Sequence, residues 1–168
     1  MDRQKSIELL NKAVADELQA ILQYMYFHFH LDDQGFGPLA LLFKRTAIEE
    51  MMHVERLAER ILFLKGDVKM EVGGAIRPLR EVRQMLECAA GMEESSAKDY
   101  NAWAAESGAN ADAISKRLFE DLVADEERHY DQYATEMENL EKFGDRYLAL
   151  QSIERSKTMA AGPGTAGA

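Results

Sequence analysis

The chain has 168 residues with a single cysteine, a net charge of −10, 46% hydrophobic residues and 30% charged residues. This length is enough for one domain with a sizeable core, and one cysteine, Cys88, excludes a framework of intrachain disulfides. The acidic balance argues against general nucleic-acid binding and suits a protein that attracts cations. No apolar run reaches the ~18 residues of a membrane span, and residues 1–5 lead into no signal-peptide core. We therefore expect a cytoplasmic protein that binds neither membrane nor nucleic acid.

Apolar residues recur at helical spacing in four long segments, and no segment has the alternation of a strand. The expected helices cover residues 6–32, 38–65, 78–107 and 111–143. Pro38 and Pro78 fit the first positions of the second and third helices, and Gly66 fits the C′ position after the second. Residues 67–77 are about long enough to cross one end of a bundle, so the second and third helices could run parallel.

The C-terminal part follows a different pattern. Residues 145–156 form a short amphipathic segment, which predicts a fifth helix. Residues 158–168 are rich in alanine and glycine, and we expect them to form a disordered tail after a domain that covers residues 1–157. The predicted fold class is all-α, a four-helix bundle with a long crossover and a short fifth helix.

Glutamate and histidine stand three residues apart in both the second and the fourth expected helix. Residues i and i+3 share one helical face, so the two side chains of each Glu-x-x-His pair can bind the same metal ion. A lone glutamate in an apolar row precedes each pair by 33 positions, and each residue of the second half lies 76 positions after its counterpart. The set consists of Glu17, Glu50 and His53 in the first half and Glu93, Glu126 and His129 in the second.

Four carboxylates in an apolar interior need compensation, because isolated buried charges are very unfavourable. Two divalent cations would balance them if both imidazoles are neutral. Carboxylate and imidazole ligands suit iron, manganese and zinc, and two of the carboxylates can bridge the pair of ions. A single buried glutamate or histidine more often has a structural role, but six in register on four helices point to a metal centre.

Other residues near this set have more ordinary readings. Tyr24 and Tyr100 also stand 76 positions apart. Both fit ordinary core positions, and Tyr24 equally fits a hydrogen bond to a ligand carboxylate. Asp125 can hold the outer nitrogen of a ligand histidine, as carboxylates around metal sites do. His28 and His30 are not expected to belong to this site.

From about residue 6 to residue 156 the chain resembles a bacterioferritin. The resemblance rests on Asp16–Leu18, Tyr24, Glu50–His53, Ala58–Gly66, Glu93 and Asp125–His129. It implies a ferritin-like di-iron domain in which Glu17, Glu50 and His53 hold one iron, Glu93, Glu126 and His129 hold the other, and Glu50 and Glu126 bridge them. It also implies a ferroxidase that oxidises Fe²⁺ with O₂ or H₂O₂. The ferric mineral would lie in a shell of twenty-four subunits built from dimers, and a ferredoxin-type reductant would serve iron release.

A methionine next to the first Glu-x-x-His pair also matches the bacterioferritin pattern, and the resemblance there implies haem binding. One helical step turns about 100°, so Met51 should leave the inward row of Glu50 and reach the outer face of the helix. Ile48 lies one turn back, and the edge of the first helix adds Leu18, Leu22 and Met25. In bacterioferritins this face is the two-fold subunit contact, where such a methionine ligates a b-type haem from each side. An ordinary interface methionine is the alternative, and Met52 is the weaker haem candidate.

The chain departs from some bacterioferritins at one point. Arg45 and Glu49 stand where those members place a histidine and an aspartate for a further iron site, and arginine does not bind iron. The main functional alternative is a rubrerythrin-like di-iron peroxidase without storage, which usually adds a module with paired Cys-x-x-Cys. One cysteine cannot supply that module. Dps-like proteins, larger di-iron oxygenases and a pure haem-binding protein fit the internal ligand set or the chain length less well.

Overall fold

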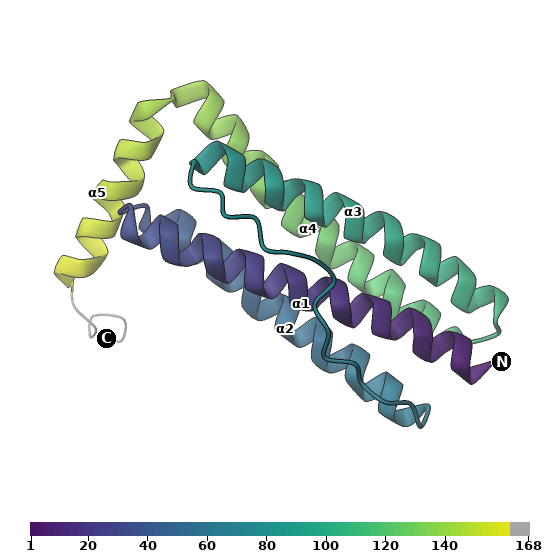
Figure 1. Ribbon diagram of the computed structural model, residues 1–168. Helices are drawn as coiled ribbons and strands as arrows, with labels where there is room; N and C mark the ends of the chain where they lie inside the picture. Colours follow the sequence, from purple (N-terminus) through teal and green to yellow (C-terminus); the bar gives the residue numbers. More distant parts are fainter. Residues whose placement is uncertain (162–168) are drawn as a thin grey trace, which may run out of the picture.

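The structure is a computed structural model that describes residues 1–161, and this part of the chain contains five α-helices and no strand. The helices are α1 (Arg3–Asp33), α2 (Gly37–Phe63), α3 (Val82–Ala109), α4 (Ala113–Phe143) and α5 (Asp145–Ala161). The pairs α1–α2 and α3–α4 form two hairpins that pack into a four-helix bundle, and α5 lies across one end of it (Figure 1). The predicted all-α bundle is confirmed. None of the described helices is both long and apolar enough to cross a bilayer.

Local features explain two of the differences between the observed and the predicted helix ends. The first helix begins at Arg3, because the Asp2 carboxylate caps it by accepting hydrogen bonds from the backbone N–H groups of residues 4 and 5 at 2.9 and 3.3 Å. After α2, Lys65 adopts the left-handed conformation at φ 64°, so it occupies the C′ position predicted for Gly66. Gly66 is needed for space, since a Cβ there would lie 2.8 Å from the side chain of Ile7.

The crossover between α2 and α3 runs along the bundle instead of across one end (Figure 1). Two buried amides of α1 hold it. Asn11 bonds to the backbone of residues 67 and 69 at 3.0 and 2.8 Å, and Gln23 bonds to the N–H and C=O of Arg77 at 2.7 and 3.0 Å. Because Gln23 takes up both backbone groups of Arg77, the chain stays non-helical there, and α3 begins at Val82 instead of Pro78.

The apolar core consists of two clusters separated along the bundle axis. One contains Tyr24, Phe27, Phe43 and Tyr133, and the other contains Leu10, Val14, Leu57, Ile61 and Phe119. On each of the four bundle helices, the predicted ligand residues stand between the residues of one cluster and those of the other. These ligand residues are buried, so the bundle encloses one polar layer between two apolar ones.

The fifth helix is longer than predicted. It continues to Ala161, so residues 158–161 are helical and the expected tail cannot begin at residue 158. The rest of the expected tail, residues 162–168, lies outside the described part of the chain.

Candidate metal centre

All six residues of the predicted ligand set meet in the polar layer. Each is at most 4% exposed: Glu17, Glu50, His53, Glu93, Glu126 and His129. The helices α1 and α3 each contribute one glutamate, and α2 and α4 each contribute a Glu-x-x-His pair whose members project to the same side. Helical periodicity therefore brings four distant segments of the sequence to one point.

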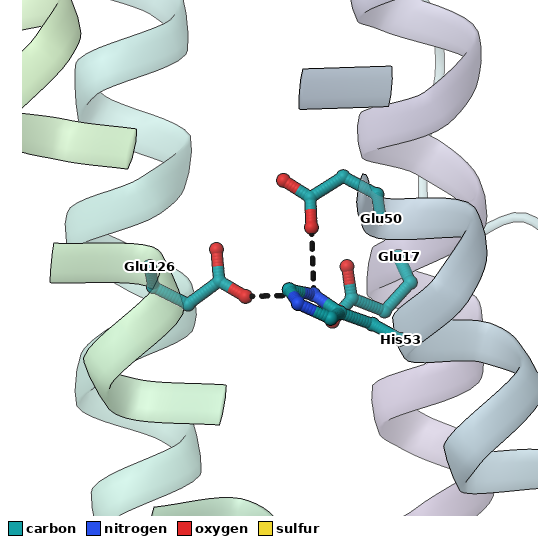
Figure 2. Close-up of side chains that lie close together, drawn as sticks. All are labelled: Glu17, Glu50, His53 and Glu126. Carbon is teal, nitrogen blue, oxygen red and sulfur yellow. Dashed lines mark ion pairs between the residues drawn. The ribbon is translucent and has the colours of Figure 1, made fainter. Parts of the chain in front are cut away.

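The first group surrounds Nδ1 of His53, as Figure 2 shows. This nitrogen lies 2.8 Å from Oε2 of Glu50 and 3.2 Å from Oε1 of Glu17. Glu126 reaches across from α4 and places its Oε1 3.4 Å from the same nitrogen. Three carboxylates and one imidazole thus converge on one small volume.

The second group surrounds Nδ1 of His129. Its nearest carboxylate oxygen is Oε1 of Glu50 at 3.1 Å, and oxygens of Glu93 and Glu126 both lie at 3.7 Å. Glu50 and Glu126 belong to both groups, and within each group one ligand atom per residue lies within 4.8 Å of the others. The arrangement is two overlapping metal-sized sites that share two carboxylates.

Several atoms at the centre of this cluster have no hydrogen-bond partner among the described residues. They are both carboxylate oxygens of Glu50, Oε1 of Glu126, and Nδ1 of His53 and of His129. Buried polar atoms without partners are unfavourable and uncommon in folded proteins. The unpartnered atoms face one another at contact distance, so the donor set fits a pair of cations placed between them.

The ionisation of the cluster reflects its burial. Burial, followed by the charge of Glu50, holds the pKa of Glu17 well above its usual 4.5. Burial alone would lower the pKa of His53, but the nearby carboxylates of Glu126, Glu17 and Glu50 favour its protonated form and raise that pKa to about 12. Without metal, bound protons therefore reduce the negative charge of the cluster, and metal cations that bind there must displace these protons.

Two tyrosines hold the outer glutamates in a crossed arrangement. Tyr24 of α1 donates a hydrogen bond to Glu93 of α3, as one of the two readings of Tyr24 predicted. Tyr100 of α3 donates to Oε1 of Glu17 of α1 at 2.7 Å. Sequence reasoning gave Tyr100 only an ordinary core role, although its offset from Tyr24 matched that of the ligands.

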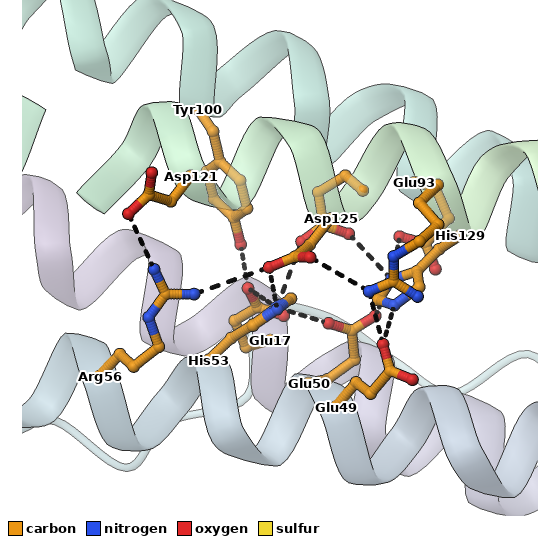
Figure 3. Close-up of polar contacts among 12 residues, drawn as sticks. Glu17, Glu49, Glu50, His53, Arg56, Glu93, Tyr100, Asp121, Asp125 and His129 are labelled. Carbon is orange, nitrogen blue, oxygen red and sulfur yellow. Dashed lines mark hydrogen bonds and ion pairs between the residues drawn. The ribbon is translucent and has the colours of Figure 1, made fainter. Parts of the chain in front are cut away.

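Two further carboxylates face the outer nitrogens of the histidines, again crossed between helices (Figure 3). Oδ2 of Asp125 lies 3.3 Å from Nε2 of His53, at the place predicted for Asp125. Oε2 of Glu49 lies 2.9 Å from Nε2 of His129. The role of Glu49 was missed, although Glu49 precedes Asp125 by the same 76 positions as the ligand pairs.

The remaining sequence candidates lie away from this centre. Nδ1 of His28 contacts a backbone carbonyl of α2 at 2.8 Å, and His30 contacts Arg80. Met51 and Met52 are 53% and 48% exposed, so both leave the inward row of α2, as the helical phase predicted. Leu22 and Ile48 are also exposed, whereas Leu18 and Met25 are half-buried.

Comparison with known proteins identifies the class first. The ferritin-like domain family matches residues 7–152, in agreement with the bundle and its buried carboxylate–histidine layer. The chain is 36% identical to the bacterioferritin of Desulfovibrio desulfuricans over 160 residues, 95% of this chain and 89% of that protein. It is 37% identical to the bacterioferritin of Rhodobacter capsulatus over 150 residues, 87% of this chain and 91% of that protein.

A solved structure gives the same answer. An X-ray structure of the D. desulfuricans bacterioferritin, which describes its diiron site in different catalytic states, matches with a TM-score of 0.88 at 36% identity. The match covers 89% of this chain and 88% of that one. The chain belongs to the bacterioferritin family.

Proposed function

We propose that this protein is a ferroxidase that stores iron. Each subunit binds two Fe²⁺ ions, one at Glu17, Glu50 and His53 and the other at Glu93, Glu126 and His129, with Glu50 and Glu126 bridging. The observation that carries the proposal is the pair of overlapping ligand groups, whose atoms lie within 4.8 Å of one another and share those two carboxylates. Family membership and the diiron site of the D. desulfuricans relative support iron as the metal.

The surrounding residues balance the charge of the two ions and hold their ligands in place. Two Fe²⁺ ions bring four positive charges, which balance four carboxylates when both imidazoles are neutral. Tyr24 and Tyr100 each donate a hydrogen bond that fixes an outer glutamate, and Asp125 and Glu49 face the outer nitrogens of the histidines. Each Fe²⁺ gives up one electron, and the two electrons together with two protons reduce O₂ to H₂O₂, or H₂O₂ to two molecules of water.

Iron storage requires that the subunits assemble around a cavity. We propose that the subunits form a shell of twenty-four built from dimers, with the ferric product inside, and that a ferredoxin-type reductant serves iron release. The net charge of −10 per subunit supports electrostatic attraction of Fe²⁺ to such a shell. Oxidation should then slow as NaCl is raised from 0.05 to 0.5 M, because salt screens exposed charges. A rate that does not depend on salt would contradict electrostatic attraction.

We further propose that Met51 ligates a b-type haem at the two-fold contact between subunits. Met51 lies outside the ligand row and is exposed, as are Ile48 and Leu22, and a symmetric dimer would bring two copies of the methionine to the axis. In haem-replete cells, Met51→Leu should lose the haem absorption, whereas Met52→Leu should keep it. Haem retained in the Met51 variant would contradict the assignment.

The ferroxidase proposal is tested by iron oxidation in variants that still assemble. Glu17→Ala, Glu93→Ala and His129→Ala should each slow Fe²⁺ oxidation sharply, while light scattering shows an intact shell. Glu94→Ala is the matched control, because Glu94 is the exposed neighbour of Glu93 on α3. If the three ligand variants oxidise iron as fast as the control, the site lies elsewhere. Consumption of H₂O₂ without retained ferric iron would indicate the peroxidase alternative.

A further inference from the structure

Arg128 of α4 joins the two carboxylates that face the outer nitrogens of the histidines. Its Nη2 lies 2.6 Å from Oε2 of Glu49 and 3.1 Å from Oδ1 of Asp125. The three side chains are between 32% and 45% exposed, whereas His53 and His129 are buried. One guanidinium nitrogen at the solvent edge of the centre thus contacts the carboxylate partners of both histidines.

We propose that Arg128 is a positioning residue that couples the two histidine positions of the metal centre. It holds Glu49 on Nε2 of His129 and Asp125 on Nε2 of His53, and so keeps the Nδ1 atom of each ring turned toward the metal. The inference rests on the proposed di-metal site. The physical basis is that a carboxylate partner fixes both the tautomer and the orientation of a ligand histidine. A half-exposed carboxylate without a cation beside it would turn to water more readily.

The contacts predict an unequal effect on the two positions. Asp125 has a second arginine, since Nη1 of Arg56 lies 3.6 Å from its Oδ2, and Figure 3 shows Arg56 on that side of Asp125. Glu49 has no second arginine or lysine within ion-pairing distance among residues 1–161. Loss of Arg128 should therefore disturb the His129 position more than the His53 position.

An ordinary surface ion pair would behave differently. Exposed ion pairs contribute little to stability, and their removal leaves a distant metal site unchanged. A measurement of metal occupancy at each position separates the two possibilities, because metal affinity at each position depends on how its histidine is held and not on the stability of the surface.

The test uses the full assembled protein and Co²⁺ alone under anaerobic conditions. Calorimetry gives the total affinity, and anomalous scattering from crystals equilibrated with limiting Co²⁺ gives the occupancy of each position. We compare Arg128→Leu with Arg128→Lys, which keeps a cation, and with Arg117→Leu. Arg117 is an exposed arginine of the same helix that makes no ion pair within residues 1–161. Arg128→Gln replaces the leucine variant if that variant does not assemble.

Removing a partner around a metal ligand typically weakens binding roughly 10–100-fold. We expect Arg128→Leu to weaken binding about 10-fold at the His129 position and less at the His53 position, Arg128→Lys to restore most of it, and Arg117→Leu to match the parent. Glu49→Gln should affect mainly the His129 position, and Asp125→Asn mainly the His53 position. Parent-like occupancy in Arg128→Leu, or loss confined to the His53 position, would overturn the coupling. A parent that binds fewer than two Co²⁺ per subunit would instead contradict the proposed di-metal centre.

Discussion

Replacing Glu93 with glutamine should stabilise the metal-free protein while it weakens metal binding. Glu93 is 1% exposed, and burial, followed by its contacts with Glu126 and Glu50, raises its pKa well above 4.5. A carboxyl whose pKa is higher in the folded state stabilises the fold only while it stays protonated. Its contribution is complete below pH 4.5 and is lost as the pH rises through the folded-state pKa. Glutamine has the same shape without the charge, so it should recover that loss at neutral pH.

The size of the effect follows from the surroundings of Glu93. Replacement of buried ion pairs by uncharged side chains of similar volume is often neutral or stabilises a protein by ~1–4 kcal/mol, and Glu93 lies among like charges, whose repulsion glutamine removes. The carbonyl oxygen of the new glutamine can still accept the hydrogen bond of Tyr24, so little is lost in exchange. A gain of about 2 kcal/mol corresponds to a rise in Tm of roughly 4–8 °C for a chain of this size. Below pH 4 the gain should vanish, because the glutamate is then protonated in both states.

Thermal unfolding of chelator-treated protein at pH 7.5 and pH 4, at one subunit concentration, measures this effect. Glu94→Gln is the control, and its Tm should match the parent at both values of pH. Added Co²⁺ should then raise the Tm of the parent more than that of Glu93→Gln, because a ligand stabilises the state that binds it by mass action. The reasoning is refuted if metal-free Glu93→Gln melts at or below the parent at pH 7.5, or if Co²⁺ stabilises both equally.

Three further predictions concern residues around the centre and in the loops. Tyr100→Phe removes the donor to Glu17 and should slow Fe²⁺ oxidation by roughly 10-fold in stopped-flow assays; an unchanged rate would show that the bond is not needed. Burial and a nearby aspartate raise the pKa of Asp16 to about 6, so Asp16→Asn should stabilise the metal-free protein by about 1 kcal/mol above pH 6 and not below pH 3.8. A pH-independent urea midpoint difference would contradict this. Gly66→Ala places a methyl group 2.8 Å from Ile7 and should destabilise the fold by about 1–3 kcal/mol in urea titrations; a stable alanine variant would show that the contact relaxes freely.

The meeting of the six candidate ligands could be predicted because burial and helical period constrain the same positions. A charged residue in an apolar row must have a partner, and the shared offset of 76 between halves showed which residues would meet. The bundle itself followed from the same rows. The cost of an unpaired buried charge thus predicts from the sequence that Glu17, Glu50, Glu93 and Glu126 share one layer.

The residues that sequence reasoning missed lie where that constraint is weak. Glu49 and Arg128 are 42% and 45% exposed on their side chains, so the apolar pattern gives no sign of their contacts. Tyr100 looks like any core tyrosine, since its partner Glu17 stands 83 positions away. The start of α1 at Arg3 depends on the local cap by Asp2, and the space at Gly66 is limited by Ile7 of another helix. These contacts can be identified only from the distances between residues in the folded bundle.

Anaerobic calorimetric titration of the metal-free protein with Fe²⁺ tests the central claim most directly. The parent should bind two Fe²⁺ per subunit with release of protons, because the cations replace the protons held by the buried cluster. His53→Ala and His129→Ala should each lose tight binding at one position. Binding of fewer than two ions by the parent, or a stoichiometry of two that survives in both histidine variants, would contradict the assignment of the centre.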